Sequence, residues 1–249
     1  MGSVQAEFLK LKRSMSWAVV IVLPLMAVIT GTTNTVVSGQ QLDDGWKTLW
    51  LRVIVFYGLF PLAVGVAALA SLIWRVEHRD GNWNALMGRR VSSLEIVLGK
   101  AAVLAALMAA MQLVLLAGTV LAGKLIFGLP GFIPSEYLLV SVIIVLACLP
   151  VATLQSALSM LMRSFAAPIA IALLGAVVSV GLLLAEINGL IAVVPYALLG
   201  RATQLGTGYF ADSGSITTGT MLLLIVASAG LTALTVVATA AGLDRRDIR

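Results

Sequence analysis

Residues 137–162 read YLLVSVIIVLACLPVATLQSALSMLM, a run of 26 residues without a charged side chain. A helix of about 20 apolar residues crosses the roughly 30 Å hydrocarbon core of a bilayer. We therefore predict an all-α, polytopic membrane protein with six transmembrane helices in one domain over residues 1–249. The five other blocks, of 20 to 24 residues, that lack Asp, Glu, Lys and Arg are 17–37, 53–74, 101–123, 166–185 and 220–243.

The composition agrees with this prediction. Hydrophobic residues make up 60% of the chain and charged residues 11%, where a soluble domain carries about 25% charged residues. These proportions exclude an ordinary soluble enzyme and a disordered chain. The net charge is +5, but the basic residues flank the apolar blocks and form no extended basic face. They indicate attraction to a membrane surface rather than binding to nucleic acid.

The distribution of basic residues predicts the orientation. With the N-terminus in the cytoplasm, six spans leave twelve Lys and Arg residues inside and four outside, which is the usual excess of positive charge in cytoplasmic segments. We therefore predict a multi-pass protein of the cell inner or plasma membrane with both termini cytoplasmic; the inverse topology contradicts the bias. The outer four are Lys47, Arg52, Lys124 and Arg201.

Residues 4–15 precede the first apolar block. Val4, Phe8 and Leu11 recur at helical spacing, whereas Lys10 and Lys12 fall on the other face. This pattern favours an amphipathic helix that lies at the level of the lipid headgroups. The alternative is a solvated tail that only sets the topology.

The sizeable cytoplasmic loop, residues 75–100, carries eight of the 27 charges. In it Trp83, Leu86 and Met87 recur at i, i+3 and i+4, which predicts a short helix with one apolar face. Such a face either docks on another protein or rests on the bilayer surface. Sequence spacing alone does not separate these two interpretations.

Residues 186–219 follow the fifth apolar block and form the predicted outer segment. Glu186 and Asn188 interrupt the apolar pattern, and residues 189–199 are apolar but too short to cross a bilayer. We expect this stretch to lie at the outer interface or to enter the membrane and return, followed by an exposed loop over 200–219. Glu186 and Asn188 are candidates for the outer end of a substrate pathway; the alternative is a helix end that meets water.

No catalytic motif is present in the sequence. Its single histidine, His78, and single cysteine, Cys148, cannot supply a usual zinc site, and neither GxSxG nor a Walker A loop occurs. The chain is therefore predicted not to be an enzyme. Gln112 and Gln155 fall inside apolar blocks, where we expect each to form a hydrogen bond between helices.

Three features together resemble a known family. They are the N-terminal segment EFLKLKRS (7–14), the loop motif E-x-R-x-G-N-W-x-x-L (77–86) and Gly99-Lys100 at the start of the third apolar block. With six spans, this pattern resembles the permease subunits of type-2 ABC exporters, and among them the permeases of lantibiotic and bacteriocin immunity.

The resemblance implies a single permease domain with partners. Residues 82–90 would form a coupling helix that contacts a separate ABC ATPase, which would hold ATP and Mg²⁺, so this chain would need no cofactor. A second permease, identical or paralogous, would complete the transporter in the membrane lipid. The family's fifth helix has a broken outer end, which corresponds to 186–199. The residues implied in coupling are Glu77, Arg79, Asn82, Trp83, Leu86, Met87, Arg89 and Arg90.

The sequence thus favours a subunit of an ATP-driven exporter of an amphiphilic substrate, such as an antimicrobial peptide or a hydrophobic drug. Two alternatives remain open. A proton-driven carrier usually has Asp or Glu within its spans, and here only Glu186 lies near one. A membrane scaffold or sensor subunit is the other alternative.

Overall fold

The computed structural model describes Glu7, Phe8, Leu11, Trp83 and residues 14–39, 42–78, 91–210 and 212–247. Within this part of the chain, the regular structure is helical. Five helices are long and apolar enough to cross a membrane, which confirms the predicted all-α polytopic class. They are α2 (Ser16–Val37), α6 (Ser93–Leu125), α7 (Ser135–Leu161), α8 (Ala166–Leu184) and α11 (Thr218–Asp247).

The predicted second span consists of two helices, α3 (Trp46–Leu59) and α4 (Pro61–Arg75), which meet at an angle of 49°. Pro61 occupies the first turn of α4, where its missing N–H costs no helical hydrogen bond. With this bent pair counted as one span, the structure has the six spans that we predicted. The sequence prediction started this span at residue 53, after the charged Lys47 and Arg52. In the structure α3 begins at Trp46 and includes both residues in its first two turns.

Helix α6 has 33 residues, so it is about 50 Å long at a rise of about 1.5 Å per residue. It therefore extends past the hydrocarbon core of a bilayer. Its first turn is closed by a capping box, in which the Glu95 N–H donates to Ser92 Oγ and the Ser92 N–H donates to Glu95 Oε2. This cap gives the 75–100 loop a fixed end at α6.

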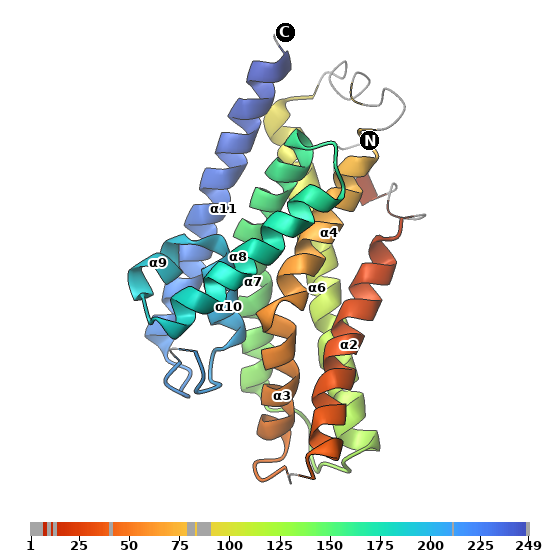
Figure 1. The fold of residues 1–249 in the computed structure, drawn as a ribbon, viewed down its shortest axis with the longest axis vertical. Coiled ribbons are helices and arrows are strands. Elements are labelled where there is room, and N and C mark those ends of the chain that lie inside the picture. Colours follow the sequence, from red (N-terminus) through yellow and green to blue (C-terminus); the bar gives the residue numbers. More distant parts are fainter. Residues whose placement is uncertain are drawn as a thin grey trace.

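The start of α2 and the end of α11 lie at the same end of the bundle (Figure 1), as an even number of crossings requires. We call this end the inner end and the opposite one the outer end. Helix α7 contacts both α4 and α11, and α2 packs against α3 and α6. Most of the buried side chains are apolar, and large ones such as Trp50, Tyr57 and Met111 are fully buried.

Candidate functional site

The predicted coupling loop is described at both of its ends. Glu77 and Trp83 fall within the described residues, and both lie against the inner end of the bundle. The remaining predicted coupling residues lie outside the described residues: Arg79, Asn82, Leu86, Met87, Arg89 and Arg90.

The root of this loop holds a buried cation. Lys100, two turns into α6, is 0% exposed. Its Nζ donates to Glu7 Oε2 and to Glu77 Oε1, each at 3.1 Å, and lies 4.5 Å from the centre of a Trp74 ring. We call Glu7, Trp74, Glu77 and Lys100 the Lys100 cluster. It joins the N-terminal segment, the end of α4 and the start of α6.

The burial of the Lys100 cluster determines its energetic role. A buried charge is tolerated when it is paired and hydrogen-bonded, and removing one partner of a buried pair costs about 3–5 kcal/mol. The ion pairs therefore hold the three segments together, since separating them leaves the buried Lys100 ammonium without its two carboxylate partners. The cluster fixes the position at which the loop leaves α4.

Glu77, which the resemblance implies in coupling, has a buried carboxylate. It is 3% exposed, because the carboxylate turns inward to Lys100. The sequence analysis used Lys100 for the orientation and for the family resemblance, and it missed Glu7 as the partner of Lys100. The available signal was a lone lysine placed directly before an uncharged block of 23 residues, 101–123.

Trp83 also packs against its own chain. Its ring stacks on His78, with ring centres 5.7 Å apart and an angle of 3° between the planes, and it lies 6.1 Å from Trp74. It is half-buried beside Ile96, Met160 and Leu243. The indole therefore has one face on the bundle, and only part of the Trp83 side chain is accessible to a partner.

Hydrogen bonds to α7 hold the same region from the other side. Trp74 Nε1 donates to Ser156 Oγ at 2.7 Å. His78 Nε2 lies 2.9 Å from the Ser159 carbonyl oxygen, and because a carbonyl only accepts, this nitrogen carries the proton. The end of α4 and the beginning of the loop are thus attached to α7 as well as to α6.

The outer segment contains two short helices, α9 (Asn188–Val193) and α10 (Pro195–Thr203). Glu186 has φ +54° and, like Asn188, is exposed at the turn between α8 and α9. The chain is therefore broken after α8, as the sequence predicted. Both candidate pathway residues are open to a ligand, and their role stays a prediction.

Helix α10 returns into the bundle and packs on α3, α7 and α8 (Figure 1). A Cβ at Gly58, near the end of α3, would overlap the Thr203 side chain, so α10 meets the second span where that span breaks. The expected exposed loop over 200–219 is wrong for its first part. Thr203, Gln204 and Leu205 are buried, because α10 continues through 200–203.

Both glutamines inside the spans form the predicted hydrogen bonds between helices. Gln112 Nε2 on α6 donates to Ser141 Oγ on α7 at 3.0 Å, and Gln155 Nε2 on α7 donates to the Tyr196 hydroxyl on α10. Among the described residues, no group of three or more His, Cys, Asp and Glu side chains is placed to hold a metal ion.

A family model described as "ABC-2 family transporter protein" matches residues 3–179, from the N-terminal segment into α8. The chain belongs to the ABC-2 transporter family. It is accordingly a transmembrane subunit of an ABC transporter, a family whose members generally work with an ABC ATPase. No curated protein and no solved structure matched this ABC-2 transporter chain, and the resemblance to lantibiotic immunity permeases stays a prediction.

Proposed function

We propose that this ABC-2 transporter subunit exports an amphiphilic substrate, and that a separate ABC ATPase drives it through the 75–100 loop. A second permease subunit, a copy of this chain or a paralogue, completes the pathway. ATP and Mg²⁺ belong to the ATPase in this proposal. Opening and closing of the ATPase dimer moves the loops of both permeases.

The observation that carries the proposal is the Lys100 cluster. Glu77 is part of the 75–100 loop and directly follows α4, and its carboxylate is ion-paired to Lys100 on α6. A partner that displaces the loop therefore also pulls on Glu77. Because the buried pair resists separation, a push on the loop moves α4 and α6 together with the N-terminal segment. The cluster thus supports mechanical coupling between a cytoplasmic partner and two spans.

The apolar interior supports an amphiphilic substrate. The six uncharged blocks contain no acidic residue, whereas proton-driven carriers usually place Asp or Glu within their spans. In the proposal the substrate leaves near Glu186 and Asn188, which are exposed at the break between α8 and α9. A cationic amphiphile would meet the Glu186 carboxylate there.

Affinity purification in mild detergent from the native host tests the ATPase partner. The proposal expects an ABC ATPase to copurify and its hydrolysis to rise when substrate is added to the reconstituted complex. Recovery of a sensor kinase without an ATPase contradicts the proposal and supports the scaffold or sensor alternative.

Truncation of Trp83 tests the loop as the coupling element. Loss of an aromatic anchor from an interface costs about 2 kcal/mol or more, so Trp83→Ala should weaken ATPase association about 30-fold or uncouple hydrolysis from export. Trp83→Phe, which keeps the stack on His78, should retain coupling. Trp17→Ala is the matched control, because Trp17 is exposed at the start of α2. Unchanged transport by Trp83→Ala would contradict docking through this side chain.

A further inference from the structure

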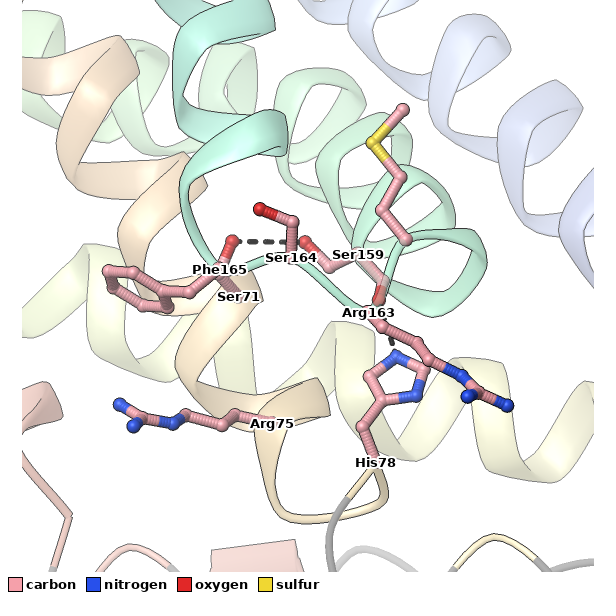
Figure 2. Close-up of a pocket in the computed structure, with 8 residues that line it drawn as sticks. Ser71, Arg75, His78, Ser159, Arg163, Ser164 and Phe165 are labelled. Atoms are coloured by element: carbon pink, nitrogen blue, oxygen red, sulfur yellow. Dashed lines mark hydrogen bonds between the residues drawn. The ribbon is translucent and has the colours of Figure 1, made fainter.

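A cavity of about 280 Å³ opens at the inner end of the bundle, where α4 ends and the chain passes from α7 to α8 (Figure 2). The function proposed above does not use it. Its lining combines cationic side chains with hydroxyl groups. The lining residues are Ser71, Arg75, His78, Ser159, Met162, Arg163, Ser164 and Phe165.

Two guanidinium groups give the cavity its charge. Arg75 closes α4 and lies 5.7 Å over the Phe165 ring; Arg163 lies in the connection between α7 and α8. Figure 2 shows Arg75 on one side of the cavity and Arg163 beside His78 on the other. Within the described part of the chain, neither arginine pairs with a carboxylate. The cavity therefore presents positive charge that the surrounding described side chains leave uncompensated.

Hydroxyl and backbone donors complete the lining. The buried Ser71 and Ser159 hydroxyls are 3.2 Å apart, and Ser164 Oγ accepts from the Ala167 N–H in the first turn of α8. Helix α8 has 19 residues and begins at this cavity. The N-terminus of a helix carries partial positive charge and free N–H groups, which suit an anion. Arginine, serine and a helix N-terminus are groups that bind phosphate.

The depth of the cavity favours a lipid as the source of the phosphate. Arg75 is the last residue of one span and Phe165 directly precedes another, which is the level at which a bilayer places its headgroup phosphates. The lining residue Phe165 is exposed and apolar, so an acyl chain would follow along it. Basic pockets between membrane helices at the cytoplasmic side bind acidic lipid headgroups.

We propose that this cavity binds the phosphate of an anionic phospholipid headgroup, held by Arg75 and Arg163. The proposal does not depend on the direction of transport or on the substrate. A bound headgroup bridges the end of α4 and the start of α8, so the lipid acts as a tie between these helices at the inner end.

Native mass spectrometry of the full chain in mild detergent tests the site. The probes are phosphatidylglycerol, phosphatidylcholine and inorganic phosphate, each titrated separately. We expect one phosphatidylglycerol to be retained at least tenfold more tightly than phosphatidylcholine, and inorganic phosphate to bind at least tenfold more weakly than either. Equal retention of the two lipids, or binding of inorganic phosphate as tight as that of phosphatidylglycerol, overturns the proposal.

Charge variants assign the binding to this cavity. Arg75→Gln with Arg163→Gln should weaken phosphatidylglycerol binding at least tenfold, since each guanidinium donates to the phosphate, and Arg75→Lys with Arg163→Lys should retain most of it. Arg245→Gln removes an exposed charge from α11 at the same end and should leave the affinity unchanged. If Arg245→Gln weakens phosphatidylglycerol binding as much as the double glutamine variant does, the proposal is overturned.

A partner protein is the competing occupant of the cavity. If the glutamine variants lose association with the copurified ATPase but bind phosphatidylglycerol normally, the arginines serve the protein interface and the lipid proposal is wrong. If the glutamine variants do not fold, the wild-type protein still decides the question. It should prefer phosphatidylglycerol over phosphatidylcholine, and excess short-chain phosphatidylglycerol should displace the bound lipid by competition.

Discussion

The two ends of the bundle use ion pairs differently. At the inner end Lys100 pairs with Glu7 and Glu77, which are 93 and 23 residues away in sequence. At the outer end Arg201, on α10, pairs with Asp212, 11 residues away, at 2.9 Å. The first set joins three segments of the fold, whereas the second organises one loop.

The environment of the outer pair supports this distinction. Asp212 also accepts from the N–H groups of Gly208 at 3.0 Å and Gly214 at 2.9 Å, so its carboxylate closes the loop that follows α10. Arg201 remains partly exposed, while Lys100 is fully buried. The ion pairs of Lys100 join distant segments, so these segments are expected to move together. The pair of Arg201 and Asp212 stabilises only the loop in which it lies.

The contrast between the two ends assumes that the inner end faces the cytoplasm. Cysteine labelling tests this topology with an all-or-none result. Cysteines introduced at Asp44 and Ser213 should react with an impermeant reagent in intact cells, and one at Asn82 should not, because the basic residues concentrate on the Asn82 side. The native Cys148 is buried and should stay unlabelled, which provides the background. External labelling at Asn82 would contradict the six-span topology.

Loss of the inner cation should have the largest energetic effect. Lys100→Met removes the buried cation that Glu7 and Glu77 share and should lower the free energy of unfolding by about 3–5 kcal/mol, measured by thermal melting in detergent. Replacing both carboxylates by glutamine in the same variant should restore much of the loss. Lys124→Met is the control, since Lys124 is half-buried at the outer end and donates to the Leu129 carbonyl oxygen. Equal melting of the two single variants would refute a special role for the buried cation.

The outer pair should show a smaller and local effect. Asp212→Asn removes the charge that holds Arg201, Gly208 and Gly214, and hydrogen bonds to a charged group are worth about 1.5–3 kcal/mol. We expect faster proteolytic cleavage near 206–217 from outside, with little change in the melting of the whole protein. Asp43→Asn, an exposed carboxylate in another outer loop, should leave cleavage unchanged. A fall in global melting as large as that of Lys100→Met would remove the contrast between the two ends.

The smallest effect concerns the proposed exit. Glu186→Gln keeps the shape of the side chain and removes its charge, so resistance to cationic peptides should fall by less than about fivefold, as exposed charge pairs contribute little. Resistance to neutral substrates should not change. Glu136→Gln, an exposed acid in the first turn of α7, is the control in a survival assay at matched expression. An identical response of both variants to cationic peptides would take Glu186 out of the pathway.

The sequence by itself determined the class of the protein and the number of its spans. Uncharged blocks of 20 to 26 residues predict membrane helices because the bilayer core has a fixed thickness. The interruption at Glu186 and the hydrogen bonds of Gln112 and Gln155 also followed from local pattern, because a polar group in an apolar run must meet a partner or water.

Only the tertiary structure decided where the charges and the short helices lie. Lys100 is buried because Glu7 and Glu77 arrive beside it from other segments, and α10 is buried because α3, α7 and α8 surround it. Composition and periodicity indicate only whether a segment favours an apolar or a polar environment. Which distant segment provides that environment depends on how the helices pack. For that reason the sequence pattern did not predict the pairing of Glu77 with Lys100 or the stacking of Trp83 on His78.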